Sequence, residues 1–277
     1  ALAWLLCNNG HSVTLWSFLE EENEMFLKHH ENTDKLPGVV LPDAVKYTTD
    51  LQEAVEGQEL IVMAVPSPAV RATAKRMKTI VKPGQVIVDV AKGIEESTLM
   101  TMSQIIEDEI PQAKVAVLSG PTHAEEVGKG LPTTIVTGAV DMETAEYVQN
   151  VFMSPVFRVY TSQDKLGIEI GAAVKNVIAL AAGIADGLGY GDNTKAALIT
   201  RGIAEIARLG TAAGAKASTF GGLSGIGDLI VTCASMHSRN RRAGILIGQG
   251  YSMQEAMDKV HMVVEGVYSA KAARKMA

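Results

Sequence analysis

The strongest constraint on the fold is a change of pattern near residue 160. Before it, short runs rich in β-branched residues alternate with amphipathic stretches of helical length; the runs cover 12–16, 60–65, 86–91, 114–119, 133–138 and 157–161. This alternation predicts an α/β arrangement around a mainly parallel sheet. Several runs are apolar throughout, which is typical of strands that helices cover on both faces. We therefore predict one α/β domain over residues 1–163.

The rest of the chain has a different pattern. From residue 164 onward it is rich in Ala, Gly and Leu and keeps a helical period, most clearly over 165–185 and 194–213. Glycine lowers helix propensity, but it lets helices approach one another closely. We predict an all-helical second domain over 164–277. With 47% hydrophobic residues in 277, the chain has enough apolar surface for both cores.

The composition excludes several classes of function. The net charge of -6 argues against general nucleic-acid binding. The longest uninterrupted apolar run, 177–185, is far shorter than the ~20 residues of a membrane span, so no span is expected. The two cysteines, Cys7 and Cys233, lack metal-ligand spacing, which predicts reduced thiols in a cytoplasmic protein.

The first sixteen residues are typical of the second half of a βαβ unit. A short helix is followed by the cap residues 8–10 and then by a β-rich run. In nucleotide-binding units a strand and a glycine-rich turn precede such a helix. We expect both before Ala1 and interpret the chain as a fragment, truncated at its C-terminal end as well. Without the backbone donors of that turn, it should bind cofactor poorly.

Three loops follow the apolar runs of the α/β domain. They begin at Pro66, Lys92 and Gly120, and Arg71 lies about a turn beyond the first. Ligands bind outside the carboxyl ends of the strands in open α/β sheets, so we expect the loops to face one crevice. Proline, glycine and serine there are also ordinary turn residues. Lys92 is more informative, because a cation at a strand end suits a phosphate or a carbonyl oxygen.

The helical domain contributes a lone charge. Lys175 is the only charged residue in the fifteen-residue apolar stretch 171–185. Most such lysines extend to the surface or pair with a carboxylate. However, Gly171 and Ala172 lie one turn away and form a small-residue face with room for a ligand.

A second stretch of the helical domain, residues 222–244, combines a glycine-rich turn with Asp228 and the basic cluster 238–242. Arginine with Ser and Asn supplies the forked donors that phosphate oxygens accept, although such clusters are more often solvated surface.

Six motifs in this order together resemble one family. They are VPSPAVR, AKGIE, SGPTHAEEV, KNVIALAAGIADGLGYGDNTKAALITRG, GLSGIGDLIVTC and SRNRRAG. The chain resembles the bacterial type of NAD(P)-dependent glycerol-3-phosphate dehydrogenase over nearly its whole length. The resemblance implies a Rossmann-like, mainly parallel sheet followed by an all-helical C-terminal domain. It also implies interconversion of dihydroxyacetone phosphate and sn-glycerol 3-phosphate with NADH or NADPH, a supply of glycerol 3-phosphate for phospholipid synthesis, and a homodimer.

The resemblance also implies residue roles, with no metal among them. Lys175 would be the catalytic acid and base and would contact the substrate. The other substrate-binding residues would be Lys92, Gly120, Thr122, Asp228, Ser238, Arg239 and Asn240. Cofactor contacts would come from Lys92, Ala124, Arg239, Val263 and Glu265. Thr122 stands where the family usually has Ser, a change that keeps the hydroxyl.

The direction of the reaction depends on the protonation of Lys175. A lysine at its ordinary pKa of ~10.4 is protonated at pH 7, which suits an acid that protonates a developing alkoxide. We therefore expect reduction to be favoured near neutral pH, unless burial strongly lowers the pKa of Lys175.

The cofactor preference depends on the residues after the first β-rich run. Ser17, Phe18 and Leu19 follow it, and then Glu20. None of these residues is basic, so none can bind a 2′-phosphate, whereas the Glu20 carboxylate can bind a ribose hydroxyl. The sequence thus leans toward NADH.

Two alternatives remain beside this interpretation. One is a related two-domain dehydrogenase of hydroxy acids, which the basic cluster 238–242 argues against. The other is a nucleotide-sensing module without catalysis, for which we would expect Lys175 or Lys92 to be replaced.

Overall fold

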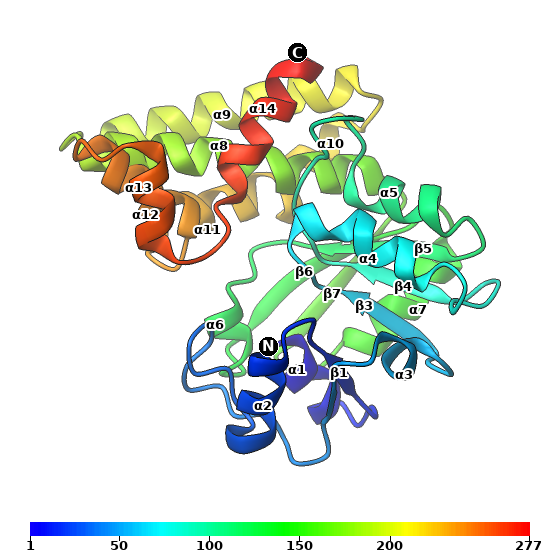
Figure 1. Ribbon diagram of the computed structural model, residues 1–277. Helices are drawn as coiled ribbons and strands as arrows, with labels where there is room; N and C mark the ends of the chain where they lie inside the picture. Colours follow the sequence, from blue (N-terminus) through cyan, green and yellow to red (C-terminus); the bar gives the residue numbers. More distant parts are fainter.

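The computed structural model describes all residues from 1 to 277 and has an α/β part and a helical part (Figure 1). The main sheet has five strands in the order β3-β4-β5-β6-β7, all parallel to their neighbours except for the antiparallel pair β5 and β6. Its strands are β3 (Leu60–Met63), β4 (Val86–Asp89), β5 (Lys114–Ser119), β6 (Thr133–Gly138) and β7 (Phe157–Ser162). The predicted mainly parallel sheet is confirmed.

Two further strands form a separate parallel pair. They are β1 (Thr14–Trp16) and β2 (Lys46–Thr48), and neither pairs with the five-stranded sheet. The sequence pattern predicted β1 but missed β2, because a strand of three residues is too short to show a period. The preceding helix α1 (Leu2–Asn8) ends before Gly10, which has a φ of 90°. This left-handed conformation favours glycine and explains the predicted helix end.

Helices cover both faces of the five-stranded sheet (Figure 1). On one face α1 and α7 pack against Val86 and Val88, and on the other α4 and α5 pack against Ile87. Alternate strand residues thus enter different cores, which accounts for runs that are apolar throughout. The helices of this part are α2 (Glu20–His29), α3 (Leu51–Val55), η1 (Ser67–Ala69), α4 (Val70–Met77), α5 (Met102–Glu109), α6 (Ala124–Val127) and α7 (Met142–Phe152).

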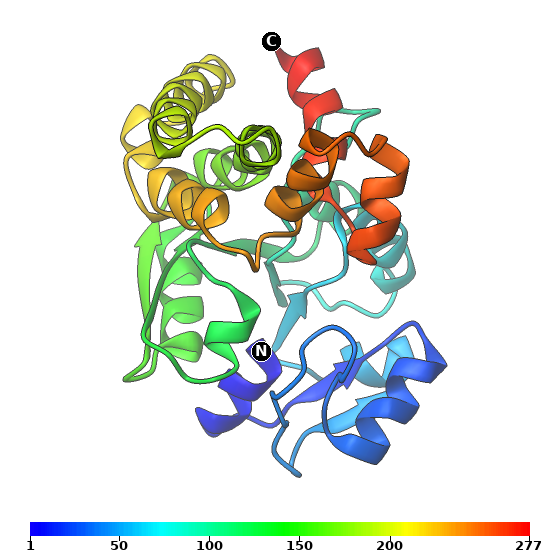
Figure 2. The same cartoon turned by 90° about the vertical axis from the view of Figure 1, so that its left-hand side faces the viewer.

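The C-terminal part is all-helical, as predicted. Its central helix α8 buries fifteen of its 23 residues, and α9, α11, α12 and α14 pack around it (Figure 2). The elements are α8 (Lys165–Gly187), α9 (Asp192–Ala212), α10 (Ala217–Phe220), the π-helical turn η2 (Leu223–Gly227), α11 (Asp228–Ala234), α12 (Arg239–Gly248), α13 (Met253–Val260) and α14 (Glu265–Met276).

Glycines set the distance between α8 and α12. Gly183 and Gly187 of α8 face Gly244 and Gly248 of α12. A Cβ on Gly183 would lie 2.2 Å from a carbonyl oxygen of α12, and one on Gly244 would lie 2.2 Å from a carbonyl oxygen of α8. No side chain fits at either position, so the two backbones are in direct contact. We call these four residues the glycine seam.

Two helical stretches are long and apolar enough to cross a membrane, Lys165–Gly187 and Ala217–Ala234. The expectation of no span counted only the uninterrupted apolar run 177–185. The whole of α8 has 23 residues and is long enough. In the apolar window of α8, 72% of the residues are buried inside the protein. This is the position of a core helix. The corresponding share for Ala217–Ala234 is 39%.

Candidate active site

The site lies where the carboxyl ends of β4 and β5 meet the helical part. Lys92 follows β4, Lys175 lies on α8, and Asp228 is the first residue of α11. The Asp228 carboxylate accepts a hydrogen bond from Lys175 Nζ at 2.6 Å through Oδ1, and one from Lys92 Nζ at 2.8 Å through Oδ2. Lys92 also donates to the Gly120 carbonyl at 3.2 Å. We call Lys92, Lys175 and Asp228 the Lys–Asp–Lys cluster; it joins the two parts of the chain.

Lys175 has a second hydrogen-bond partner, Thr232, that was not predicted from the sequence. Thr232 Oγ1 accepts a hydrogen bond from Lys175 Nζ at 2.6 Å and donates one to the Asp228 carbonyl at 2.6 Å. Thr232 lies one helical turn after Asp228 on α11, so both side chains reach the same lysine. Its four-residue spacing from Asp228 is the signal that could have identified it.

Burial dominates the electrostatics of the Lys–Asp–Lys cluster. Lys175 is 5% exposed and Asp228 is 1% exposed. Loss of water around Lys175 lowers the pKa of its amine to about 7, although Asp228 opposes the shift. For Asp228, burial alone would raise the pKa, but the two lysines hold it below its usual value. The expected preference for reduction depended on an ordinary pKa of Lys175. Because burial lowers that pKa to about 7, the protonation state of Lys175 does not favour reduction over oxidation at pH 7.

The ends of β3 and β4 also contact the start of α14. Ser67 donates to the Glu265 carboxylate through its hydroxyl at 2.6 Å and through its backbone N–H at 3.3 Å. A Cβ on Gly93 would lie 2.6 Å from the Ser67 Cβ, so glycine is required for this approach. Burial raises the pKa of Glu265, and the charge of Arg239 opposes that shift. Ser67 was not among the predicted site residues.

Two asparagines connect α8, α12 and α14. Asn240 Nδ2 donates to Asn176 Oδ1 at 2.9 Å, and the Gly266 N–H donates to Asn240 Oδ1 at 2.7 Å. Ser238 caps α12, where its hydroxyl accepts a hydrogen bond from the Arg241 N–H at 3.2 Å. The predicted residues Ser238 and Asn240 are thus both buried and hydrogen-bonded within the helical part.

The remaining predicted residues lie around these contacts. Thr122 donates through its hydroxyl to the Gly120 carbonyl at 3.1 Å. Ala124 begins α6 and is exposed, and Val263 lies in the turn between α13 and α14. Arg239 begins α12 and forms no ion pair with another residue. Of these residues, Thr122 shares the Gly120 carbonyl with Lys92, and the charge of Arg239 acts on Glu265.

The structure corrects the expectation for Arg71. Its guanidinium does not face the crevice but donates to Glu95 at 2.7 and 2.8 Å, to Asp108 at 2.7 Å and to Glu109 at 2.6 Å. These carboxylates lie 24 to 38 residues away in the chain. Arg71 therefore fastens α4 to α5 and to the loop after β4.

Two expectations for the helical part are also corrected. Arg241 belongs to the basic cluster 238–242, but it donates to Asp186 at 2.8 Å and to the Ala234 carbonyl at 2.7 Å. The small-residue face beside Lys175 is filled, since a Cβ on Gly171 would lie 2.7 Å from the Ser224 carbonyl oxygen. That face is occupied by η2 and has no room for a ligand.

His123 is a further residue that the sequence analysis missed. Its Nε2 atom is buried and has no hydrogen-bond partner. Burial lowers the pKa of His123, the Val231 carbonyl opposes this shift, and the charge of Lys175 adds to it. An unpartnered ring nitrogen beside the lysine marks a position where a polar ligand atom can be bound.

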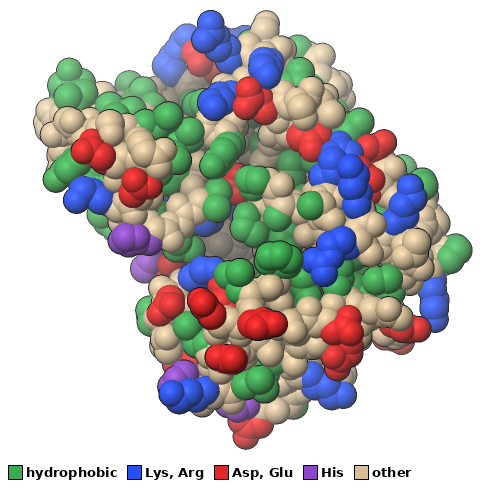
Figure 3. All heavy atoms as spheres, in the orientation of Figure 1, with side chains coloured by type: hydrophobic (Ala, Val, Ile, Leu, Met, Phe, Trp, Pro, Cys, Tyr) green, Lys and Arg blue, Asp and Glu red, His purple; other side chains and the backbone are tan.

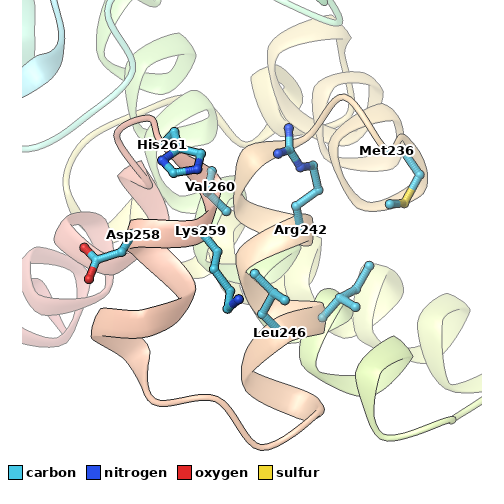
Figure 4. A pocket seen from close by; sticks show the side chains of 8 residues that line it. Met236, Arg242, Leu246, Asp258, Lys259, Val260 and His261 are labelled. Atoms are coloured by element: carbon cyan, nitrogen blue, oxygen red, sulfur yellow. The ribbon is translucent and has the colours of Figure 1, made fainter.

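Figure 3 shows the surface hollowed between the helical part and the lower part of the α/β domain. One groove, of about 760 Å³, lies between α12 and α13 and is lined by Arg242 and His261 among others (Figure 4). A second groove of about 380 Å³ is lined by Ser67 and Tyr268. Neither includes a residue of the Lys–Asp–Lys cluster. The structure holds no group of three or more side chains placed to bind a metal ion.

Together, the mainly parallel α/β domain, the helical domain and the buried lysine between them define a two-domain dehydrogenase class. Two family models, the N-terminus and the C-terminus of NAD-dependent glycerol-3-phosphate dehydrogenase, match residues 1–145 and 164–277. The chain belongs to the NAD-dependent glycerol-3-phosphate dehydrogenase family. The predicted resemblance is confirmed.

Individual relatives agree with this membership. The chain is 64% identical over 277 residues to a glycerol-3-phosphate dehydrogenase [NAD(P)+] of Agathobacter rectalis, covering 100% of this chain and 82% of that protein. It is 62% identical to the protein of that name from Fusobacterium nucleatum, with coverages of 99% and 82%. A crystal structure of glycerol-3-phosphate dehydrogenase from Coxiella burnetii matches with a TM-score of 0.96 at 34% identity, covering 100% and 85%.

Proposed function

We propose that the protein is an oxidoreductase that interconverts dihydroxyacetone phosphate and sn-glycerol 3-phosphate with NADH or NADPH. The observation that carries the proposal is the Lys–Asp–Lys cluster at the junction of the two parts. One carboxylate there is shared by two lysines, one from a strand end and one from a core helix. Family membership supplies the substrate, since the relatives are named for it.

Lys175 acts as the acid and base. In the reduction, its ammonium group gives a proton to the oxygen that was the ketone carbonyl, and in the oxidation the neutral amine removes that proton. A pKa of about 7 leaves both forms populated near neutral pH. Asp228 and Thr232 hold the Nζ atom in place through their hydrogen bonds of 2.6 Å.

The dinucleotide supplies or accepts the hydride when it is bound. The residues present fit such a group on two observations. Gly93 leaves the carboxyl ends of β3 and β4 close together at the Ser67–Glu265 contact, where open α/β sheets bind dinucleotides. His123 Nε2 is buried without a partner beside Lys175. The cofactor-contacting residues we propose are Lys92, Ala124, Arg239, Val263 and Glu265.

The substrate phosphate needs donors away from the reacting carbon. Arg239 forms no ion pair within the chain, and it begins α12 beside the buried Asn240. A helix N-terminus and a guanidinium both favour an anion. We propose that Arg239, Asn240 and Ser238 lie toward the phosphate, and that Lys92, Gly120, Thr122 and Asp228 lie toward the reacting end.

The two alternatives predict different substrates. A hydroxy-acid dehydrogenase would bind a carboxylate, which an arginine also recognises, so turnover of a hydroxy or keto acid is what distinguishes it. A sensing module would not need a lysine of pKa about 7 in contact with a buried carboxylate.

Three properties of the whole molecule belong to the same proposal. We place the domain boundary at residues 163 and 164, between the end of β7 and the start of α8. We propose a homodimer that forms through the helical domain, which sedimentation can test. We further propose a cytoplasmic protein that supplies glycerol 3-phosphate for phospholipid synthesis.

The test is loss of NADH absorbance on adding dihydroxyacetone phosphate to the full chain, with pyruvate as the comparison substrate. Turnover of dihydroxyacetone phosphate alone supports the proposal. Turnover of pyruvate alone would indicate the hydroxy-acid alternative. Binding of NADH without turnover of either would indicate the sensing module.

A further inference from the structure

Arg76, which belongs to α4, lies over the end of β1. Trp16 is the last residue of β1, and its Nε1 donates to the Thr49 carbonyl at 3.0 Å. The Phe18 ring lies 6.4 Å from the Trp16 ring in an edge arrangement and is 72% exposed. The Arg76 guanidinium, from α4, lies 5.5 Å from the Trp16 ring centroid and 5.7 Å from that of Phe18.

The two arginines of α4 differ in their partners. All the carboxylate contacts on this helix are made by Arg71 and, at 3.9 Å, by Lys75. Arg76 is exposed, forms no ion pair and donates no hydrogen bond to another residue. Stacking on aromatic faces fixes the plane of the guanidinium but leaves its in-plane N–H groups unused. Those groups have the fork geometry that binds phosphate oxygens.

The position of Arg76 in the fold indicates which ligand group its free N–H groups can bind. In a dinucleotide-binding sheet, the residues after the second strand of the βαβ unit lie at the ribose 2′ position. A carboxylate there binds the 2′-hydroxyl, and a nearby arginine accommodates a 2′-phosphate. The order of α1 and β1 makes β1 that second strand. The sequence after β1 has no cation, but the structure brings one from α4.

The acidic residues near this point do not neutralise Arg76 by direct contact. Glu22 accepts a hydrogen bond from the Ser17 hydroxyl at 2.8 Å and is paired with Lys35. Glu20 and Glu21 are exposed in the first turn of α2 and form no ion pair. The end of β1 therefore offers both a carboxylate and a cation.

We propose that Arg76 is a specificity-determining residue that binds the 2′-phosphate of NADP(H), held in position by Trp16 and Phe18. Arg76 then accounts for the use of NADPH beside NADH that the names of the relatives state, against the lean toward NADH drawn from the residues after β1. This proposal rests on the proposed function, because it requires a dinucleotide at this sheet.

The test compares the dissociation constants of NADPH and NADH for the full chain, measured by titration without substrate. Arg76→Ala should weaken NADPH binding about ten-fold, the size of a lost charge-assisted contact, and change NADH binding less than about two-fold. Arg76→Lys keeps the charge but not the fork and should fall between. Lys78→Ala removes an exposed cation near the end of α4 and should change neither constant.

A second titration separates this proposal from the proposed function. The probes are 2′-phospho-ADP-ribose and ADP-ribose, which carry no nicotinamide and undergo no reaction. Arg76→Ala should weaken only the first. If the Arg76→Ala protein reduces dihydroxyacetone phosphate with NADH but keeps the wild-type NADPH to NADH ratio of dissociation constants, the role of Arg76 is overturned and the proposed function stands. If the wild-type chain binds neither dinucleotide, both fall.

Discussion

Two ion clusters in this molecule have opposite compositions. In the Lys–Asp–Lys cluster two cations share one carboxylate, whereas in the second cluster Arg71 is shared by Glu95, Asp108 and Glu109. The first lies between the two domains, and the Asp228 side chain is 2% exposed. The second lies within the α/β domain, and the Asp108 side chain is 49% exposed.

The difference supports our proposal that the Lys–Asp–Lys cluster is the one that takes part in catalysis. Excess negative charge around Arg71 is only partly buried, and the Asp108 side chain is half exposed, so water and counterions screen it. Excess positive charge around Asp228 is buried, where an unpaired charge is expensive. It is relieved when Lys175 loses a proton or when an anion binds. Arg71, with three carboxylate partners, therefore serves as a structural joint, whereas Asp228, with two lysine partners, suits the reactive site that we propose.

The largest expected effect comes from removing the buried lysine. Lys175→Met should lower kcat about a thousand-fold, because the proton donor is lost while the apolar stem is kept. Steady-state kinetics with dihydroxyacetone phosphate would measure it. Lys271→Met, an exposed lysine of α14, is the matched control and should leave kcat unchanged. A kcat within ten-fold of wild type for Lys175→Met would show that another group supplies the proton.

The next effect comes from removing the shared carboxylate. Asp228→Asn should lower kcat/KM for reduction about a hundred-fold at pH 7, since the loss of the negative charge lowers the pKa of Lys175 further. Less of the lysine is then protonated, and the rate profile of reduction shifts to lower pH. Asp108→Asn makes the same change in the Arg71 cluster and should alter kcat/KM less than about two-fold. Equal losses in the two variants would remove the distinction between the clusters.

The wild-type pH dependence should show the lowered pKa directly. Oxidation of glycerol 3-phosphate needs neutral Lys175, so with a pKa of about 7 its rate should rise about ten-fold between pH 6 and pH 8. Reduction needs the protonated form and should fall over the same interval. The pH dependence of kcat/KM in both directions, which reports the pKa of the free enzyme, would measure this. An oxidation rate that rises only above pH 9 would mean that burial does not lower the pKa of Lys175 in solution.

The smallest effect should come from changing the Arg71 cluster. Arg71→Ala should lower Tm by about 2–4 °C, the shift that about 1 kcal/mol produces in a protein of this size, and leave kcat within about two-fold. Thermal unfolding and steady-state kinetics would measure the two values. A loss of activity without a loss of stability would place Arg71 in the site after all.

Part of this arrangement was predictable from the sequence. Apolar runs identified six of the seven strands, and the position of Lys92 after such a run placed it at the correct sheet edge. The three residues of β2 could not be found in this way, because so short a strand exists only through its pairing with β1. Strand pairing over 32 residues is a tertiary effect that leaves no local period.

The directions in which long side chains point could also not be predicted from the sequence. Arg71 was expected to face the crevice, and it turns away because Asp108 and Glu109 lie on the helix beside it. Arg76 was not noticed, since its aromatic neighbours Trp16 and Phe18 are 60 and 58 positions away in the chain. Both arginines lie on one short helix, and only the packing of other elements against it distinguishes their surroundings.

The glycine seam has a consequence for the substrates that the protein can use. Because α8 and α12 touch backbone to backbone, neither helix can slide or tilt without a clash, so Lys175 and Asn240 keep one separation. In the proposed arrangement, with Lys175 at the reacting end of the substrate and Asn240 at its phosphate, this separation sets the length of the substrate. We therefore expect a molecule one carbon longer or shorter to be a poorer substrate, even with the same chemical groups at its two ends.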